Sequence, residues 1–308
     1  MKREDFFFDS NDGISKIHAM RWIPEEKPVC IVQITHGMSE YVERYDDFAK
    51  FLCERGILVT GDDHMGHGQS AHDNLYGYFC KGDAASTLVE DEHSLRKLTE
   101  EAYPGVPYFV LGHSMGSFII RNYIFTHGEG LKGAIVMGTG MQPKPVVTAL
   151  KIVSSLACVF GKNKKPCNGV NNMGFGTYLS KIENPRTSND WLTKDEKIVD
   201  AYNADPLCGF VFTGNGFKTL SELILRLHKK SNLEKMPKAM PVLITSGADD
   251  PVGDYGAGPK QVFESYKELG MKDVSIKLYE TDRHEILNET DRATVYADLY
   301  AWISSKLN

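Results

Sequence analysis

Gly112-His113-Ser114-Met115-Gly116 is the stretch of this 308-residue chain that decides its fold. The apolar and aromatic run at 108–111 precedes it, as in a buried parallel strand, and residues 117–127 follow with the apolar spacing of a helix. A Gly-x-Ser-x-Gly pentapeptide between a strand and a helix makes a sharp turn that lifts the serine hydroxyl clear of the sheet. The flanking glycines let neighbouring backbone approach without a Cβ clash. The sequence therefore predicts that Ser114 lies on a strained, accessible turn.

The composition is that of a globular protein with a mild acidic balance: 42% of residues are hydrophobic, 25% are charged and the net charge is −6. No basic stripe is concentrated in the chain, which argues against a nucleic-acid partner. The six cysteines are scattered without a Cys-x-x-Cys pair, so we expect free thiols in a reducing compartment. Neither a signal peptide nor a membrane span is recognised, and a cytoplasmic location is the expectation.

Strands and helices alternate over most of the chain after a predicted hairpin at residues 5–24. Strands are predicted at 29–35, 57–60, 108–111, 133–137, 241–246 and 274–279, and helices at 40–55, 84–102, 117–127, 259–269 and 292–307. This order indicates an α/β fold with a mostly parallel central sheet and helices on both faces. Active sites in such sheets lie just beyond the carboxyl ends of the strands.

The alternation breaks between residues 141 and 237, a stretch much longer than a crossover helix needs. It contains a strongly apolar run at 146–160, a loop rich in Gly, Asn and Lys at 161–176, and helical patterns at 194–203 and 220–228. We therefore predict a core made of residues 1–140 and 238–308, with residues 141–237 inserted above the strand ends as a helical cap or lid.

A serine hydroxyl becomes a good nucleophile when a base takes its proton and a third group orients that base. In this architecture the chain order is serine, acid, histidine. The strand at 241–246 is followed by the pair Asp249 and Asp250, and the last strand is followed by His284. The predicted catalytic residues are therefore Ser114, Asp250 and His284, with Asp250 preferred over Asp249.

Negative charge that develops on a substrate carbonyl oxygen needs preorganised donors. The residue after the serine supplies one backbone N–H, which belongs to Met115. The second is expected from the loop after the strand at 29–35, where Gly37 permits a turn and Met38 offers its N–H. His36 and His113 are expected to flank the site as structural residues.

The segment at 62–70 invites interpretation as a metal site, because His64 and His67 lie three residues apart beside Asp62 and Asp63. No third ligand is evident from the sequence, and Gly66 and Gly68 in this segment favour a structural loop beside the active site. We therefore predict no bound metal.

Four motifs together resemble the monoglyceride lipase and lysophospholipase branch of the α/β-hydrolases: residues 112–116, His36-Gly37, residues 63–70 and residues 202–207. The resemblance runs from about residue 25 to the C-terminus and includes the insertion. It implies a capped serine hydrolase that uses no cofactor and cleaves small-molecule carboxylic esters, namely monoacyl lipids or similar esters.

The same resemblance implies that Glu40, Arg44 and Tyr202 hold the polar head of the substrate. Other interpretations remain open, because Glu40 and Arg44 have the i, i+4 spacing of a helical ion pair and Tyr202 suits a half-buried core aromatic. One departure bears on specificity: Leu287 stands where this family has a head-group histidine, three residues after the catalytic one.

Two rival functions remain beside the ester hydrolase. One is a serine aminopeptidase or other amidase, with which related sequences are often grouped, and the other is a non-catalytic binding protein on the same fold. The apolar residues of the insertion are expected to form the wall for the acyl chain. Lys162, Lys164 and Lys165 follow them and suggest a transient contact with an anionic lipid surface. The sequence does not indicate an oligomeric state.

Overall fold

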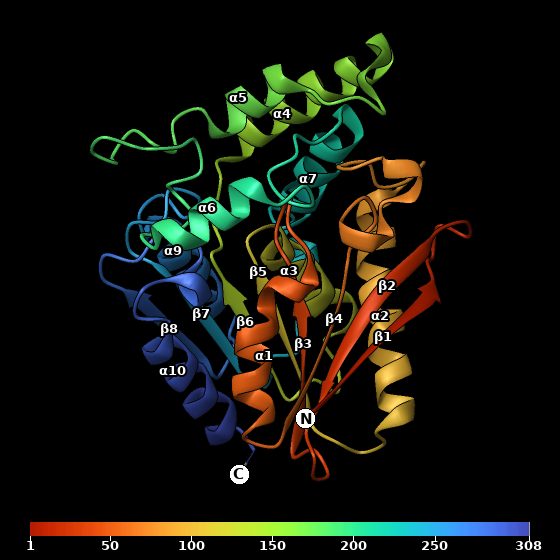
Figure 1. Ribbon diagram of the computed structural model, residues 1–308, viewed down its shortest axis with the longest axis vertical. Coiled ribbons are helices and arrows are strands. Elements are labelled where there is room, and N and C mark those ends of the chain that lie inside the picture. The colour runs from red at the N-terminus through yellow and green to blue at the C-terminus, as the bar shows by residue number, and fades with distance from the viewer. Residues whose placement is uncertain (308) are drawn as a thin grey trace.

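A computed structural model, which describes residues 1–307, contains an eight-stranded central sheet (Figure 1). The strands are β1 (Lys2–Asp9), β2 (Lys16–Ile23), β3 (Cys30–Thr35), β4 (Ile57–Asp62), β5 (Tyr108–His113), β6 (Gly133–Met137), β7 (Val242–Gly247) and β8 (Val274–Tyr279). Their order across the sheet is β1-β2-β4-β3-β5-β6-β7-β8. The pairs β1–β2 and β2–β4 are antiparallel and the others are parallel. The predicted hairpin and mostly parallel sheet are confirmed.

The strands from β3 to β7 are buried along their whole length. Their sequences are nearly continuous apolar runs, as parallel strands require when helices cover both faces. The edge strands differ, because β1 is largely exposed and β8 is only half-buried.

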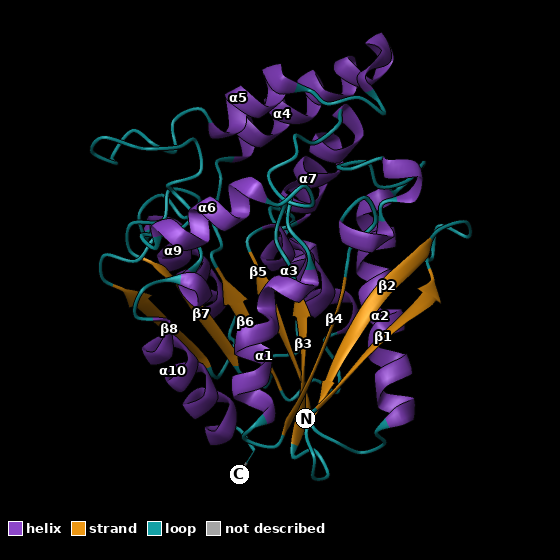
Figure 2. Cartoon of the chain, in the orientation of Figure 1, coloured by secondary structure: helices purple, strands orange, loops and turns teal. Residues whose placement is uncertain are grey.

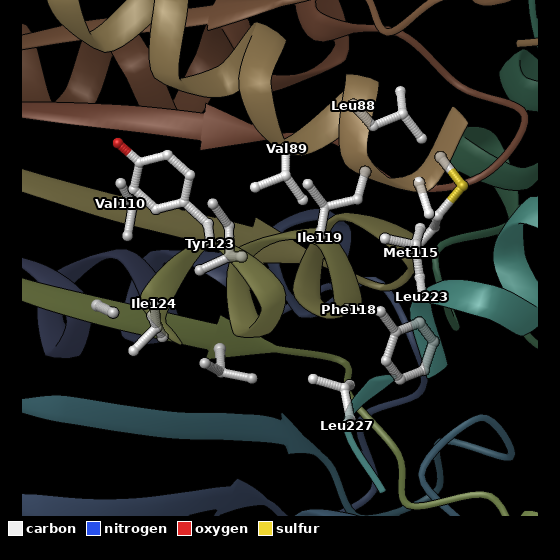
Figure 3. Packing of buried hydrophobic residues seen from close by; sticks show 14 of the residues in the cluster. Leu88, Val89, Val110, Met115, Phe118, Ile119, Tyr123, Ile124, Leu223 and Leu227 are labelled. Carbon is white, nitrogen blue, oxygen red and sulfur yellow. The ribbon is translucent and has the colours of Figure 1, made fainter. Parts of the chain in front are cut away.

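Helices cover both faces of this sheet (Figure 2). Their buried apolar side chains form two separate clusters with the sheet. One cluster joins the sheet to α1 (Asp46–Cys53) and α10 (Arg292–Ser305). The other joins it to α2 (Ala84–Ala102), α3 (Met115–His127), α7 (Gly214–Arg226) and α9 (Ala257–Glu268). Figure 3 shows Val89 of α2, Ile119 of α3 and Leu223 of α7 in this second cluster. The predicted α/β fold is thus confirmed.

Two predicted boundaries are wrong. The helix expected at 40–55 is a short 3₁₀ turn, Val42–Tyr45, followed by α1 from Asp46, because Glu40 closes the turn after β3 instead of beginning a helix. The loop expected at 161–176 contains α5 (Asn168–Phe175). Its weak helix formers are stabilised by tertiary packing, since Val170 is buried in the core.

The segment between β6 and β7 forms helices above the end of the sheet where the parallel strands finish (Figure 1). They are α4 (Lys144–Ala157), a π-helical turn at Cys158–Lys162, α5, α6 (Glu196–Ala204) and α7, which also packs against α2 and α3. The short helix α8 (Lys230–Leu233) follows α7 on the way to β7. α4 packs along α7, and Lys151 of α4 forms an ion pair with Glu222 of α7. We describe this segment below as the cap.

Within residues 1–307, one helical stretch is long and apolar enough to cross a membrane by length and composition, namely Lys144–Lys162. It spans 19 residues with a mean hydropathy of 1.4, and 11% of its apolar window is buried. Sequence inspection had not recognised it. Its inward face contains Val147 and Ser154, while its outward face exposes Val146, Ile152 and Leu156. In this structure the stretch is therefore a surface helix of the cap.

Gly116 in α3 provides a test of the close contact between α3 and β3. A Cβ atom at this position would lie 2.0 Å from the Thr35 carbonyl oxygen and 2.5 Å from that of His36. We expect Gly116→Ala to lower the free energy of unfolding, measured with denaturant, by about 1–3 kcal/mol, because neither backbone carbonyl can move cheaply. The control is Gly169→Ala in α5, where nothing lies within 4 Å of the added atom. That variant should be neutral or up to about 1 kcal/mol more stable. Equal stabilities of the two variants would contradict the packing described.

Candidate active site

Ser114 lies at the turn between β5 and α3, with φ 54° and ψ −119°. This left-handed backbone is strained for a non-glycine residue. The Ser114 N–H donates to the Met137 carbonyl at 3.0 Å, and the Ser117 N–H and hydroxyl donate to the Ser114 carbonyl at 2.9 and 2.6 Å. Gly112 has no room for a side chain, because its Cβ would lie 2.4 Å from the Gly116 carbonyl oxygen. The turn therefore has the geometry predicted for it, and Ser114 stays partly accessible.

Asp250 and His284 come together from the loops after β7 and β8. Nδ1 of His284 lies 3.0 Å from Oδ1 of Asp250, and both side chains are almost completely buried. The carboxylate also accepts the Ser246 hydroxyl at 3.0 Å and the Val252 N–H at 2.8 Å. Burial alone would raise the pKa of Asp250, but His284 and these hydrogen bonds lower it below its ordinary value. Asp249, in contrast, is exposed.

The imidazole of His284 is packed on two sides. The His113 ring, which directly precedes Ser114, lies with its centroid 4.7 Å from that of His284, and its Nε2 lies 3.2 Å from the His284 carbonyl oxygen. From the cap, the Trp191 ring lies 5.1 Å away. The structure thus brings Ser114, Asp250 and His284 to the same end of the sheet, with His113 between the serine turn and the histidine loop.

The turn after β3 lies against the serine turn. A Cβ atom on Gly37 would lie 2.5 Å from Oε1 of Glu40 and 3.1 Å from Cβ of Ser114, so a side chain there would displace the Glu40 carboxylate. Met38 follows and is partly exposed. Met115 is the first residue of α3, and its N–H therefore has no acceptor within the helix. Both predicted donor residues, Met38 and Met115, thus flank Ser114.

Glu40 fixes this turn from behind. Its Oε1 accepts the Gly37 N–H at 2.6 Å and the Tyr45 hydroxyl at 3.0 Å, and lies 3.2 Å from Nδ1 of His113. Its Oε2 accepts from Arg44 at 2.8 Å. Burial alone would raise the pKa of Glu40, but the hydrogen bond with His113 and the charge of Arg44 hold it far below its ordinary value. Glu40 is therefore a buried carboxylate that joins the glycine turn to His113.

Arg44 connects Glu40 to the histidine loop. Its guanidinium donates two hydrogen bonds to Glu285, at 2.8 and 2.7 Å, besides the one to Glu40. Burial alone would raise the pKa of Glu285, but the charge and hydrogen bonds of Arg44 lower it. Glu285 is adjacent to His284, and its N–H donates to the Leu192 carbonyl of the cap at 2.7 Å.

The predicted head-group residues are occupied by these internal partners. The Tyr202 hydroxyl donates to the Ser39 carbonyl at 3.0 Å, and its ring lies under the Arg44 guanidinium at 4.8 Å. Glu40 and Arg44 form the i, i+4 ion pair considered as the alternative. All three side chains are largely buried and already engaged in these internal contacts, so their head-group role stays a prediction. Leu287 is 5% exposed and belongs to the core.

Sequence reasoning missed Glu285 and Trp191. Glu285 lies 241 residues from Arg44, and no short-range spacing relates the two. Its position next to His284 was the only available signal. Trp191 lies in the cap, outside any helix, so no periodic pattern marked it.

A half-buried serine on a strained strand–helix turn, beside an aspartate–histidine pair, on a mostly parallel sheet is the arrangement of an α/β-hydrolase. The family described as serine aminopeptidase, S33, matches residues 26–291, and this chain belongs to it. The chain is therefore a hydrolase.

Several known proteins are similar to this chain over nearly its whole length. The monoacylglycerol lipase of Mycolicibacterium smegmatis is 26% identical over 305 residues, which cover 99% of this chain and 98% of that protein. The rat monoglyceride lipase is 26% identical, with coverage of 93% and 86%. A crystal structure of a thermostable carboxyl esterase from Bacillus coagulans, in complex with glycerol, superposes with a TM-score of 0.92 at 33% identity and covers both chains fully. These relatives support an ester-hydrolase role.

Arg44→Met tests the buried charge network, in which the Arg44 side chain is 12% exposed. We expect this variant to lose about 3–5 kcal/mol of unfolding free energy at pH 7, because Glu40 and Glu285 would be left buried without a cation. The exposed ion pair of Arg186 with Asp200 is the control, and Arg186→Met should change stability by at most about 1 kcal/mol.

The pH dependence of this loss has a definite sign. In the wild type the pKa of Glu285 is lowered, so its stabilising contribution is present above the ordinary glutamate pKa of about 4.3 and disappears as pH falls. In Arg44→Met the carboxylates stay buried without the cation, so their charging destabilises the fold as pH rises. Unfolding curves should therefore show a deficit that is largest at pH 7 and shrinks toward pH 4. A deficit independent of pH would contradict the network.

Proposed function

We propose that this chain is a serine hydrolase that cleaves carboxylic esters of monoacyl lipids through an acyl-serine intermediate. The observation that carries the proposal is the strained Ser114 turn placed beside the Asp250–His284 pair, whose contact is 3.0 Å. The serine–acid–histidine order along the chain supports this assignment.

In the proposed mechanism, His284 takes the proton of the Ser114 hydroxyl as the serine oxygen attacks the ester carbonyl. The carbonyl oxygen becomes negative and is stabilised by the N–H groups of Met115 and Met38. His284 then gives its proton to the departing alcohol, and the same base activates the water that releases the acid. Asp250 orients the imidazole and stabilises its charged form, for which its lowered pKa suits it. These steps use side chains and backbone only, and we propose no cofactor.

The substrate class rests on the relatives and on the cap. The relatives' names include monoacylglycerol lipase and monoglyceride lipase, and the carboxyl esterase was crystallised with glycerol. Leu150 and Val153 of α4 pack against the core from above, which supports the cap as the wall for an acyl chain. Lysophospholipids and other simple monoacyl esters are included in the proposed substrate class. The predicted head-group residues make internal contacts, so the proposal names no single head group.

Aminopeptidase activity, suggested by the family description, finds less support. An amine substrate would need a free carboxylate near the serine as an anchor. Glu40 and Glu285 are buried carboxylates behind this site, and Arg44 already forms ion pairs with both of them.

We also propose that the cap makes a transient contact with a membrane surface. The outward residues near its top are among the most exposed large apolar side chains of the described chain, with Val159 at 79% and Phe160 at 81%. Met173 of α5 is also 62% exposed, and Lys162 and Lys164 lie two and four residues after Phe160. An apolar surface edged by lysines suits an anionic bilayer. A cytoplasmic location is part of this proposal.

Ser114→Ala tests the nucleophile. We expect hydrolysis of an activated ester to fall by at least about 10³-fold, since only the attacking oxygen is lost. The thermal unfolding midpoint should stay close to that of the wild type, which separates lost chemistry from lost folding. Activity within tenfold of the wild type would overturn the assignment.

The neighbouring aspartates form a matched pair for the acid. Asp250→Asn should reduce kcat by about 10²–10⁴-fold, because the imidazole loses its orienting carboxylate. Asp249→Asn removes the same charge one residue earlier from an exposed position and should stay within about twofold. The reverse ranking, measured with the same activated ester, would move the acid to Asp249.

Phe160→Asp tests the membrane contact. Sedimentation with anionic phospholipid vesicles at low salt should recover most of the wild-type protein and much less of this variant, because a charge would replace an apolar anchor. Ile14→Asp is the control, since Ile14 is 80% exposed on the distant β1–β2 hairpin. If neither wild type nor control sediments with vesicles, the membrane contact is wrong, while the cap's proposed role toward the acyl chain is unaffected.

A further inference from the structure

A second cluster of polar side chains lies under the serine site and takes no part in the proposed mechanism. It consists of Asp62 at the end of β4, His64 in the following loop and Glu92 in the middle of α2. All three are at least 99% buried. One ligand atom from each lies within 4.8 Å of the other two. The sequence showed the first two residues, whereas Glu92 is the third ligand that the sequence could not reveal.

The tautomer of His64 follows from its second nitrogen. Nε2 lies 3.0 Å from the His36 carbonyl oxygen, which can only accept, so Nε2 carries the hydrogen. In the neutral ring, Nδ1 then carries a lone pair and no hydrogen. It lies 3.5 Å from Oδ2 of Asp62 and 3.6 Å from Oε1 of Glu92. A lone pair turned toward two carboxylates is repulsive unless a positive species lies between them.

Several atoms of this cluster lack partners. Among residues 1–307, Nδ1 of His64, Oε1 of Glu92 and Oδ1 of Asp62 are buried and have no hydrogen-bond partner in the protein. The Thr35 hydroxyl lies beside the Glu92 carboxylate and can donate to it. A polar group that is buried without a hydrogen-bond partner destabilises the fold. Three such atoms, from Asp62, His64 and Glu92, in one place indicate a missing ligand.

Neighbouring groups hold the side chains of this cluster by hydrogen bonds, as they do around metal ligands. The Nε2–H of His64 is held by a backbone carbonyl, which is the usual second contact of a metal-binding histidine. The other oxygen of Glu92, Oε2, accepts from the Gln33 amide, and the Gln33 carbonyl accepts from the Tyr108 hydroxyl. The two carboxylates together match the charge of a divalent cation.

We propose that Asp62, His64 and Glu92 bind a divalent first-row metal ion, of which Zn²⁺ fits best. Metal–ligand bonds of about 2.0–2.2 Å in a tetrahedron separate the donors by roughly 3.3–3.6 Å, which agrees with the two distances around Nδ1. Ca²⁺ does not fit, because it takes about 6–8 oxygen ligands. The Thr35 hydroxyl is a protein atom available for a fourth position.

Such an ion would brace the turn that carries Met38. The His64 ring stacks on the His36 ring with centroids 3.9 Å apart, and the backbone N–H of His64 donates to Nε2 of His36 at 3.0 Å. His36 in turn directly precedes Gly37, and its Nδ1 lies 2.8 Å from the Gly37 carbonyl oxygen. The ion is thus structural, and the proposal is independent of which ester the enzyme cleaves.

The test is the metal content of tag-free, full-length protein expressed with Zn²⁺ and dialysed extensively, measured by plasma mass spectrometry. We expect about one equivalent of Zn²⁺ per chain in the wild type. Asp62→Asn and Glu92→Gln should each weaken retention by at least about tenfold. The control is His93→Gln, which removes a histidine from a different histidine pair, with His127, whose rings lie 3.9 Å apart. Its zinc content should equal that of the wild type.

Two measurements on the wild type keep the test decisive if a variant fails to fold. Protein produced with Co²⁺ should show the visible absorption of a tetrahedral nitrogen–oxygen site, and denaturation followed by refolding with a chelator should lower the thermal midpoint relative to refolding with Zn²⁺. The proposal would be overturned if the wild-type protein contained no metal and its thermal midpoint responded neither to chelator nor to Zn²⁺. A proton between His64 and the two carboxylates would then take the place of the ion. Equal metal in Asp62→Asn, Glu92→Gln and wild type would also overturn the proposal, because the ion would then lie elsewhere.

Discussion

The backbone at Ser114 is the constraint on which the rest of the site depends. A φ of 54° on a non-glycine residue persists only when its surroundings hold it. Here the Ser114 N–H is bonded to β6, its carbonyl accepts twice from Ser117, and α3 approaches β3 so closely that Gly116 cannot carry a side chain. The strain is thus maintained by the packing of β3, β6 and α3 around the serine turn. Its consequence is a serine that stays partly accessible at the end of the sheet where the strands finish.

Behind this turn, buried charges connect parts of the chain that lie far apart in sequence. Arg44 joins Glu40, which holds the glycine turn and His113, to Glu285, which follows the histidine of the pair. Such a network stabilises the fold only while every member is present, because each single charge would be costly in the core. The same bonds explain why Glu40 and Arg44 serve as supports in this structure. They place the Met38 turn and the His284 loop in a fixed relation to Ser114.

Much of this arrangement could be predicted from the sequence, because parallel strands bring their carboxyl ends to one edge. That rule predicts that Ser114, Asp250 and His284 lie at one edge, whereas the burial of Asp250 and its contact with His284 distinguish it from Asp249 in the structure. The start of α1 was misjudged because apolar spacing continues through a segment whose glutamate closes a turn instead. Side-chain pairs such as Arg44–Glu285, and the approach of Glu92 to His64, depend on tertiary packing and leave no local pattern.

The most direct test of the account is the site of covalent labelling by a fluorophosphonate, located by peptide mass spectrometry. The account predicts one adduct per chain, on Ser114, formed quickly in the wild type and much more slowly in Asp250→Asn, since the reagent needs the same activated oxygen as the ester. Labelling on another serine, or equal rates in the two proteins, would contradict the assignment of Ser114, Asp250 and His284 as one catalytic unit.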